Sequence, residues 1–465
     1  ALLSLSDKEG ATELASFLQR QGLGLLASGS TAELLRRAGL DVENISDFTG
    51  TPEILGGRVK TLHPRVYGSL LYLRDDREHG AEAQRSQLVD IAVVAVNLYP
   101  FARTLAQGAG EGEIIENIDI GGVSLLRAAA KNYQHVSILC QPSDYSEFMD
   151  EWQKAGTVSE QTRAKLAAKA YSHTAHYDAM ISSWFNRKNG ELFPEKLVLA
   201  GERLQVARYG ENPHQQGAIY RTPEAAKGLP AKQLHGKEMS YNNFLDAEAA
   251  LGFLRLFSEQ AAIIIKHQNP CGSAIERNPE ESPGSIYERA LACDTVSAFG
   301  GIVGINREVD LSLAEKLCRT FYEIVLAQGY SDDALAKLCG KKNLRILQLP
   351  AQTAGLSLPV PDFRAISGGF VIQERDESLR NKAEEFAGFR CVSKVSPTEE
   401  DLRELLFAWK IASRVKSNAI VFSKDFAAPG IGAGQMSRID SVKLAAQKMQ
   451  DMGFATEGAY MASDA

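Results

Sequence analysis

Residues 261–267 read Ala261-Ala262-Ile263-Ile264-Ile265-Lys266-His267, a short apolar run that ends on two reactive side chains. Turn-forming residues follow at 268–272, so the run is typical of a core β-strand. A Lys supplies positive charge and a His accepts a proton near neutral pH, so the pair suits chemistry at the end of a strand. Spacing alone favours a plainer alternative, a Lys-His pair in an exposed loop. The rest of the chain has to decide between the two.

The size and composition of the chain restrict its class. At 465 residues it is too long for one ordinary hydrophobic core, so we expect two or three domains. Hydrophobic residues make up 44% and charged residues 23%, as in globular proteins, and no apolar segment is long enough to span a bilayer. The N-terminus lacks a signal-peptide layout. A net charge of −7 argues against a broad nucleic-acid-binding face, so an anionic ligand needs local groups.

The cysteines point to a reducing compartment. There are six of them, scattered along the chain, and they form neither a CxxC pair nor a Cys/His zinc spacing. We therefore expect reduced thiols in a cytoplasmic protein.

The first half of the chain alternates short apolar stretches with helix-like ones. Strands are expected at residues 2–5, 22–27, 91–98 and 136–140, and helices at 9–20, 32–38 and 123–130. This alternation predicts an α/β fold with a parallel sheet covered on both faces. Ligands collect outside the carboxyl ends of such strands. The residues at those ends, 4–8, 28–31 and 97–101, include hydroxyls, a glycine and a lysine, as an anion-binding rim requires.

The second half begins where this pattern loosens, around residues 192–202, and we place the main boundary near residue 200. Strands are expected at 261–265, 301–305, 344–349 and 419–422, and helices at 246–257 and 401–414. Residues 350–361 are rich in proline and small side chains and have the composition of an internal linker. Two similar sub-units divided near that linker would fit this pattern.

Three local patterns in the first half suggest a backbone shaped around a ligand. Ser28-Gly29-Ser30-Thr31 falls between a strand and a helix, where it either binds a phosphate or simply caps the helix. Residues 58–65 concentrate basic groups beside the glycine pair 56–57, and their interleaved apolar residues favour a shaped loop over a solvated charge run. Residues 118–122, Ile-Asp-Ile-Gly-Gly, lead into a helical stretch, and a tight strand-to-helix connection is the plainer alternative there.

Long motifs in the first half closely resemble a known family. The stretches SxSDK (4–8), GGRVKTLHP (56–64), NLYPF (97–101) and IDIGGxxLLRAAAKN (118–132) match the cyclohydrolase half of the bifunctional AICAR transformylase/IMP cyclohydrolase family of purine biosynthesis. The resemblance implies a methylglyoxal-synthase-like domain over residues 1–197. It also implies dehydrative closure of a formamido imidazole-carboxamide ribotide (FAICAR) to IMP.

Ring closure requires an amide nitrogen to attack a formyl carbon, so orientation and stabilisation of the developing oxyanion should supply most of the rate. The resemblance implies that the catalytic positions are Lys60, Tyr99, Asp119 and Lys131. Lys60 would stabilise the oxyanion, and the other three would handle proton transfer and loss of water. The implied nucleotide-binding positions are Ser6, Lys8, Ser28, Thr31, Arg58, Thr61, Asn97 and Gly121.

The second half resembles the transformylase half of the same family. Motifs occur in family order at residues 208–215, 243–246, 266–267, 297–301, 416–418 and 432–438. The resemblance implies that residues 198–465 form two cytidine-deaminase-like sub-domains without zinc, divided near 350–361, and that no catalytic metal is needed. The implied reaction moves a formyl group from 10-formyltetrahydrofolate, a co-substrate, to the 5-amino group of AICAR.

The amine of AICAR is a weak nucleophile, so a base that removes its proton should contribute roughly 10²–10⁴-fold. The resemblance implies that His267 is this base, that Lys266 faces the developing charge, and that Asn418 is a third catalytic position. The implied nucleotide- and folate-binding positions are Arg208, Tyr209, Asn243, Phe299, Gly300 and Arg438. Family membership also implies a homodimer that shares its transformylase sites, with small-molecule substrates and neither nucleic acid nor membrane as partner.

The two ends depart from the family pattern. The chain starts at Ala1 without an initiator Met and closes on residues 461–465, where the family continues through a Phe-Phe-Pro-Phe segment. A cyclohydrolase-only enzyme is therefore one alternative. A non-catalytic nucleotide sensor is another, although the retained catalytic residues argue against it. A lone sugar-phosphate lyase would leave the second half unexplained.

Overall fold

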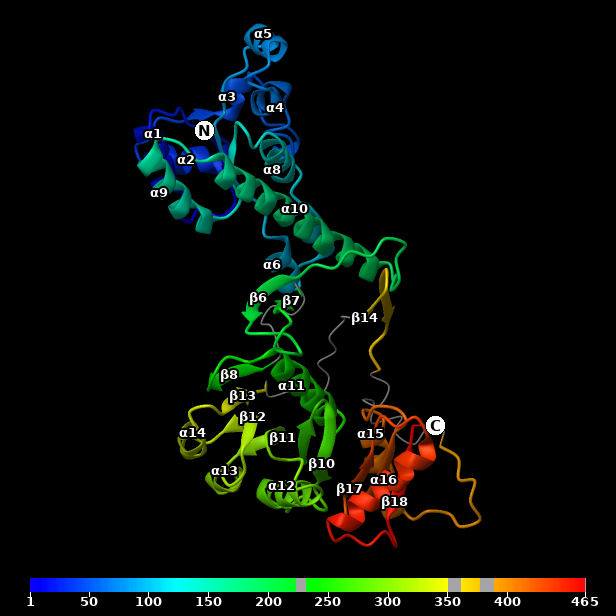
Figure 1. Cartoon of the computed structure of the whole chain (residues 1–465). Helices are drawn as coiled ribbons and strands as arrows, with labels where there is room; N and C mark the ends of the chain where they lie inside the picture. The colour runs from blue at the N-terminus through cyan, green and yellow to red at the C-terminus, as the bar shows by residue number, and fades with distance from the viewer. Residues whose placement is uncertain (223–230, 350–360, 377–388, 465) are drawn as a thin grey trace. The chain divides into compact units, whose positions relative to one another are not determined.

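The protein, described here by a computed structural model, forms two compact units, Ala1–Gly201 and Glu202–Ala465 (Figure 1). The structure describes residues 1–222, 231–349, 361–376 and 389–464. The expected linker at 350–361 lies outside the described residues except for its last position.

The first unit is built on a five-stranded parallel sheet in the order β3-β2-β1-β4-β5. Its strands are β1 (Leu2–Leu5), β2 (Leu26–Ala27), β3 (Glu43–Asn44), β4 (Val93–Asn97) and β5 (Ser137–Leu139). Its helices are α1 (Ala11–Arg20), α2 (Gly29–Arg37), α3 (Ile45–Thr49), η1 (Leu55–Gly57), α4 (Pro64–Leu71), α5 (Arg77–Arg85), α6 (Phe101–Ala106), α7 (Glu111–Glu116), α8 (Gly121–Lys131), η2 (Pro142–Asp144), α9 (Tyr145–Ala155) and α10 (Glu160–Lys188). The predicted parallel α/β sheet is confirmed.

Helices cover both faces of this sheet. Successive residues of β4 point to opposite sides: Val94 joins a core with α4, α8 and α10, and Val93 joins a core with α1, α2 and α9. A strand buried on both faces has to be apolar throughout, which is why these strands could be found in the sequence. The strand expected at 22–27 is much shorter in the structure and keeps only Leu26–Ala27.

The second unit contains a nine-stranded mixed sheet in the order β18-β16-β17-β10-β9-β11-β12-β13-β8. These strands are β8 (Lys232–His235), β9 (Ala261–Lys266), β10 (Asn269–Ile275), β11 (Gly301–Val309), β12 (Tyr322–Tyr330), β13 (Arg345–Gln348), β16 (Ile420–Lys424), β17 (Ala427–Gly432) and β18 (Tyr460–Ser463). The helices are α11 (Tyr241–Leu254), α12 (Pro283–Ala292), α13 (Leu311–Leu317), α14 (Asp332–Cys339), α15 (Glu399–Ala412) and α16 (Arg438–Asp451).

The nine-stranded sheet also carries helices on both faces. Ile263 and Ile265 of β9 pack into a core with α11 and α15, whereas Ile264 packs into a core with α12, α13 and α14. The strand predicted over 261–265 is therefore central and confirmed. The turn residues expected after it are fewer than the sequence indicates, because His267 and Gln268 alone form the turn and Asn269 already begins β10.

An internal repeat organises the second unit. The order helix, strand, two-residue turn, strand, helix, strand occurs once as α11-β9-β10-α12-β11 and again as α15-β16-β17-α16-β18. In each copy the last strand pairs antiparallel with the first strand of the hairpin. The two copies meet where β10 pairs with β17.

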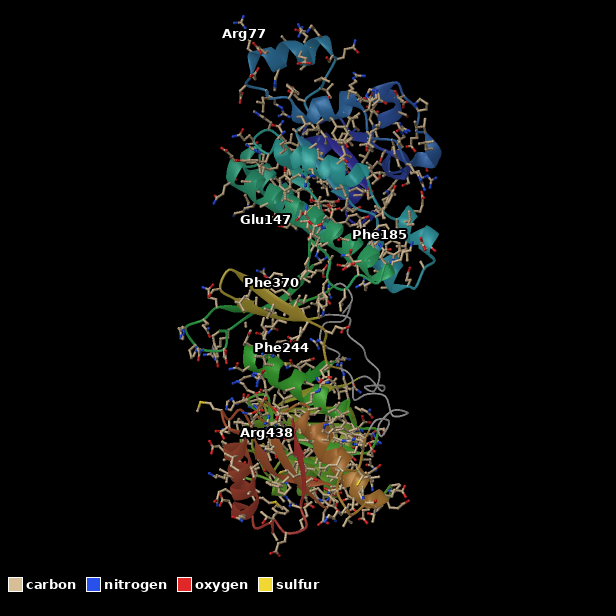
Figure 2. The ribbon with its side chains drawn as sticks, turned by 90° about the vertical axis from the view of Figure 1, so that its right-hand side faces the viewer. Arg77, Glu147, Phe185, Phe244, Phe370 and Arg438 are labelled. Atoms are coloured by element: carbon tan, nitrogen blue, oxygen red, sulfur yellow. The ribbon has the colours of Figure 1, made fainter. Side chains whose placement is uncertain are left out.

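Two small hairpins complete the second unit. They are β6 (Glu202–Ala207) with β7 (Gly217–Arg221), and β14 (Asp362–Ile366) with β15 (Gly369–Gln373). The second hairpin exposes Phe363 and Phe370, whose rings lie 6.4 Å apart; Phe370 is labelled in Figure 2. In the described part of the chain, no helix combines the length and apolar character needed to cross a membrane.

Candidate active sites

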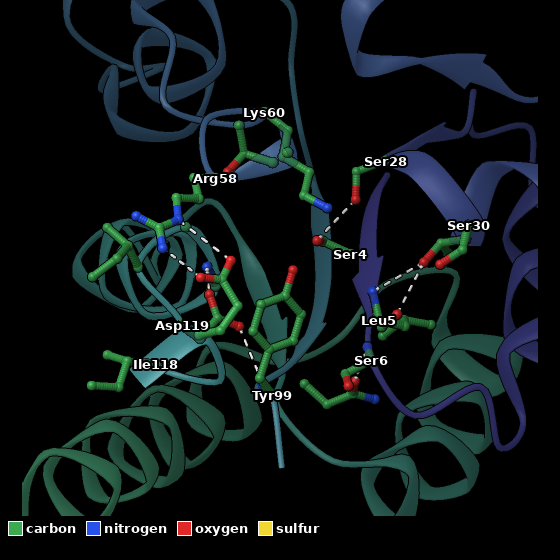
Figure 3. A pocket seen from close by; sticks show the side chains of 18 of the residues that line it. Ser4, Leu5, Ser6, Ser28, Ser30, Arg58, Lys60, Tyr99, Ile118 and Asp119 are labelled. Carbon is green, nitrogen blue, oxygen red and sulfur yellow. Dashed lines mark hydrogen bonds and ion pairs between the residues drawn. The ribbon is translucent and has the colours of Figure 1, made fainter. Parts of the chain in front are cut away.

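A cavity of about 510 Å³ opens at the carboxyl ends of the strands in the first unit (Figure 3). It lies where the sequence pattern predicts an anion-binding rim. Ten of the predicted site residues line it: Ser6, Ser28, Thr31, Arg58, Lys60, Thr61, Asn97, Tyr99, Asp119 and Gly121. Ser4 and Ser30 also line it and belong to the predicted rim, whereas Glu116, another lining residue, lies in none of the motifs.

The rim of this cavity is tied together by short hydrogen bonds between strand ends. The Asn97 side chain accepts from the backbone amides of Ser6 at 2.5 Å and Asp7 at 2.8 Å. The Lys8 ammonium donates to the hydroxyl of Thr31 at 2.8 Å. Lys8 itself is not a lining residue, so it acts behind Thr31 in this structure.

Positive charge gathers at the cavity. Burial lowers the pKa of Lys8, and the positive charge of Lys60 lowers it further. Two ammonium groups that disfavour each other's charge favour an anion between them. Arg58 is exposed and pairs with Glu116 at 2.5 Å, a hydrogen bond that raises the pKa of Arg58 and lowers that of Glu116. No motif in the sequence marks Glu116 as a partner of Arg58.

Asp119 is the half-buried acid of the cavity. It accepts from the backbone amides of Gly122 at 2.7 Å and Tyr99 at 3.3 Å. Burial raises the pKa of its carboxyl, while these two hydrogen bonds and the charge of Lys60 oppose the shift. The backbone amide of Asp119 also donates to the Tyr177 hydroxyl at 2.9 Å, which in turn donates to the carbonyl of Asn117.

Steric crowding explains why glycine occupies both positions 121 and 122. A Cβ on Gly122 would lie 2.6 Å from Asp119 Oδ2, and one on Gly121 would lie 2.8 Å from Thr61 Oγ1. Only glycine lets the start of α8 approach both side chains. Tyr177, the residue that holds the Asp119 backbone, lies on the long helix α10, and no local signal in the sequence could identify it.

Lys60, Tyr99 and Asp119 meet in one space, but Lys131 does not join them. Figure 3 shows Lys60 and Tyr99 extending into the cavity, with Asp119 beside Tyr99. Lys131 is exposed at the last position of α8, the helix whose first residue, Gly121, lines the cavity. At a rise of 1.5 Å per residue, the two ends of that helix are about 15 Å apart.

In the second unit, the Lys266-His267 pair stands at the β9–β10 turn. The Lys266 ammonium donates to the carbonyl of Phe299 at 2.8 Å, and the Asn269 side chain donates to the carbonyl of His267 at 3.1 Å. The Asn269 side-chain oxygen also accepts from the Lys416 amide at 3.2 Å. Asn269 thus joins the turn to the 416–418 segment.

Asn418 occupies the centre of a second hydrogen-bonded group. Its side-chain nitrogen donates to the carbonyl of Gln435 at 2.9 Å, and its side-chain oxygen accepts from Arg438 at 3.1 Å. Arg438 also lies 3.5 Å from Asp464. Asn418 and Arg438 are therefore brought together by the fold.

An exposed aromatic surface adjoins Lys266. Phe299 is 62% exposed, and its ring centroid lies 5.3 Å from that of Phe321. The following Gly300 has a φ of 69°, and a Cβ there would come within 3.1 Å of the Lys266 ammonium. Gly300 therefore allows the lysine to approach the strand.

Three predicted binding residues of the second unit make other contacts or follow another strand. Asn243 forms a reciprocal cap with Ser240 at the start of α11. Arg208 and Tyr209 follow β6 in the small hairpin sheet, and no hydrogen bond within the described ranges joins either of them to the His267 turn. Among the described residues, no cluster of three or more His, Cys, Asp or Glu side chains is arranged to hold a metal ion.

Comparison with known proteins matches both units. A family model described as "MGS-like domain" matches residues 10–124, and one described as "AICARFT/IMPCHase bienzyme" matches residues 129–448. The chain is 45% identical over 471 residues to "Bifunctional purine biosynthesis protein PurH" of Persephonella marina, covering 100% of this chain and 89% of that protein. The protein of the same name from Myxococcus xanthus is 47% identical over 475 residues, covering 100% and 90%.

A solved structure titled "Crystal structure of ForH" is 35% identical and covers 40% of this chain and 96% of its own, with a TM-score of 0.36.

The parallel-sheet unit and the mixed-sheet unit make this an α/β protein, and the matches identify it as an enzyme of purine biosynthesis. The chain belongs to the AICARFT/IMPCHase bienzyme family, whose members combine AICAR transformylase and IMP cyclohydrolase in one polypeptide.

Proposed function

We propose that the first unit closes FAICAR to IMP in the Lys60 cavity and that the second unit transfers the formyl group at the His267 turn. As a member of its family, the chain is a bifunctional AICAR formyltransferase and IMP cyclohydrolase of the final steps of IMP synthesis. The observation that carries the residue assignment is the convergence of Lys60, Tyr99 and Asp119 on one cavity.

The nucleotide phosphate is proposed to bind at the start of α2. Ser28 precedes this helix in an extended conformation, and its hydroxyl lies 3.1 Å from that of Ser4. Free backbone amides and hydroxyls at a helix start suit a phosphate. The Lys8 ammonium, held behind Thr31, adds positive charge at the same place. Binding an anion there offsets the mutual repulsion between Lys8 and Lys60.

Ring closure is proposed to proceed with Lys60 facing the formyl oxygen. As the carboxamide nitrogen attacks the formyl carbon, negative charge develops on that oxygen and the ammonium stabilises it. Asp119 accepts the proton that the carboxamide nitrogen loses and delivers it to the former formyl oxygen; the C–O bond then breaks, and that oxygen leaves as water with the proton of the formamide nitrogen. The raised pKa of Asp119 brings its carboxyl closer to neutral pH than that of an exposed Asp. Tyr99 carries its hydroxyl into the same space. The resemblance also assigns a proton-transfer step to Lys131. Because Lys131 lies at the far end of α8, we assign it no step here.

Formyl transfer is proposed at the β9–β10 turn, with 10-formyltetrahydrofolate as donor. His267 removes the proton of the attacking amine, and Lys266 faces the oxyanion of the tetrahedral intermediate. The intermediate collapses as the bond between the formyl carbon and N10 of the folate breaks, and that nitrogen takes the proton from His267 and leaves as tetrahydrofolate. Phe299 offers an exposed ring on which a flat heterocycle can stack, and its carbonyl accepts from the Lys266 ammonium. Arg438 and Asn418, which are joined by a hydrogen bond, supply polar contacts to the substrates.

A homodimer that shares transformylase sites is also proposed. Arg208 and Tyr209 lie on the small β6–β7 hairpin, so a second subunit is one way to bring such residues to the His267 turn. The exposed phenylalanines of the β14–β15 hairpin support an interface, because exposed apolar surface of this kind is often buried between subunits. The proposed compartment is the cytoplasm.

The test supplies the protein with AICAR and 10-formyltetrahydrofolate and follows the appearance of FAICAR and IMP. Both products are expected. FAICAR supplied alone should still give IMP, which isolates the first unit. Conversion of FAICAR without formyl transfer would identify a cyclohydrolase-only enzyme, and binding of nucleotide without any product would contradict both assignments.

A further inference from the structure

The proposed formyl-transfer turn has a structural counterpart in the second half of the internal repeat. The same number of residues separates Lys266 from Lys424 and Phe299 from Glu457. Lys266 donates to the carbonyl of Phe299 at 2.8 Å, and Lys424 donates to the carbonyl of Glu457 at 2.8 Å. The glycine after each carbonyl has nearly the same backbone angle, with φ of 69° at Gly300 and 70° at Gly458.

The tips of the two turns are also held in the same way. At the first, Asp246 of α11 accepts from the backbone amide of Gln268 at 2.7 Å. At the second, Glu404 of α15 accepts from the backbone amide of Phe426 at 2.8 Å. Asp246 and Glu404 are related by the same separation in sequence. Each hairpin tip is thus anchored by a carboxylate that projects from the helix preceding its first strand.

The backbone of both tips explains why an anchor is needed. His267 and Gln268 have φ of 50° and 64°, a left-handed conformation that side-chain-bearing residues rarely adopt. A two-residue turn of this kind normally contains Asn or Gly, and here it contains neither. A carboxylate that accepts the tip amide stabilises a conformation that the two residues would not choose.

What differs between the two turns is the side chain that the anchored backbone presents. The first position of the tip is His267 in one copy and Asp425 in the other. Because the anchor recurs where there is no histidine, it belongs to the fold. Only in the first copy does it orient a base.

We propose that Asp246 is the positioning residue of formyl transfer: its hydrogen bond to the Gln268 amide fixes the turn that presents His267. The inference rests on the proposed role of His267 as base. A base displaced by about 1 Å loses much of its effect, on the order of 10²-fold. Asp246 therefore acts on the chemical step and much less on binding of AICAR.

The experiment measures formyl transfer and FAICAR cyclisation in the same preparations of Asp246→Ala and Asp246→Asn. We expect Asp246→Ala to lower kcat for transfer roughly 10- to 100-fold, with KM for AICAR within about twofold and cyclisation unchanged. Asp246→Asn should recover most of kcat, because its amide oxygen still accepts from the Gln268 amide. An unaltered kcat in Asp246→Ala would overturn the proposal.

A rescue variant separates positioning from a direct electrostatic effect. Gln268→Gly in the Asp246→Ala background should restore kcat, because glycine adopts a positive φ without an anchor. This double variant also serves if Asp246→Ala alone does not fold. Failure of both Asp246→Asn and the glycine rescue would exclude the hydrogen bond as the cause of the loss.

Glu404→Ala is the matched control. It removes the same hydrogen bond from the second copy, so it should cost similar thermal stability and leave kcat for transfer unchanged. An equal loss of kcat in Glu404→Ala would mean that Asp246 acts only through stability, against the proposal. His267→Ala is assayed in parallel: transfer that survives this change refutes the base itself, whereas transfer lost there but kept in Asp246→Ala refutes only the positioning role.

Discussion

The Asp119 carboxylate accepts a hydrogen bond from the backbone amide of Gly122 at 2.7 Å, so the start of α8 holds the acid of the cavity in the first unit. The absence of a side chain on Gly122 permits this approach, since a Cβ there would lie 2.6 Å from the second carboxylate oxygen. The contact fixes the acid in place, and burial raises its pKa.

Asp119→Asn should lower cyclisation by about 10²-fold or more while the fold becomes more stable at neutral pH. The raised pKa of Asp119 means that its protonated form favours folding. That contribution is complete below the ordinary value of 3.8 and is lost as the pH rises through the folded-state pKa. Thermal unfolding at several pH values should show that Asp119→Asn is more stable than the parent at pH 7 and that this difference disappears below pH 3.8. A variant less stable than the parent at pH 7 would contradict the argument.

Lys60→Ala should abolish cyclisation and spare formyl transfer. Removing the ammonium leaves the developing oxyanion without its cation, a loss of roughly 10²–10³-fold by analogy with other oxyanion donors. The assay compares IMP formation from FAICAR with FAICAR formation from AICAR. Lys131→Ala is the control, because that side chain lies outside the cavity. If transfer falls together with cyclisation in Lys60→Ala, the assignment of separate sites is wrong.

Glu116→Gln should tighten nucleotide binding to the first unit. The Glu116 carboxylate now pairs with Arg58 at 2.5 Å, and both side chains are exposed. Once Glu116 is neutral, Arg58 is free to meet the anionic ligand. We expect a gain of about two- to fivefold in affinity for IMP, the range of an exposed ion pair, and it should shrink at high salt. Glu113→Gln on the same helix is the control; a gain of equal size there would indicate only a general change in charge.

His267→Ala should remove formyl transfer by roughly 10²–10⁴-fold and leave cyclisation intact. The chain provides its own matched control in Asp425→Ala, which alters the corresponding position of the second hairpin turn. Rates of FAICAR formation measured for both variants test the assignment. Comparable losses in the two variants would show that turn geometry, and not the imidazole, is being measured.

Gly272→Ala should destabilise the second unit by about 2–3 kcal/mol through overpacking. Its Cβ would lie 2.0 Å from the carbonyl oxygen of Ala290 in α12. Gly252→Ala is the opposite case. Gly252 lies within α11, and a Cβ there would have no atom within 4 Å. The higher helix propensity of alanine should therefore raise the free energy of unfolding by about 0.8–1 kcal/mol. Urea unfolding of both variants checks the sign of each change. If the two variants changed the free energy of unfolding equally, β10 and α12 would have moved apart to accommodate the methyl group at residue 272 without cost.

Much of the fold could be predicted because the central strands of both large sheets are buried on two faces. The apolar runs around Val93 and Ile263 stand out for that reason, and the parallel sheet of the first unit follows from the alternation of strand and helix. Strand β10 was harder to find. It begins at Asn269 and carries Pro270 and Gly272, which are turn signals in sequence but lie here beside a two-residue turn.

The sequence by itself determined the motifs and their order, and with them the family to which the chain belongs. Lys60, Tyr99 and Asp119 could be named because each lies in a long unbroken motif. Tertiary structure alone decided which residues meet. It pairs Arg58 with Glu116, holds Asp119 through Tyr177, and places Lys131 at the far end of α8. The reason is physical: a motif specifies side-chain chemistry locally, whereas hydrogen bonds and repulsions between distant segments exist only after the sheet has set their separation.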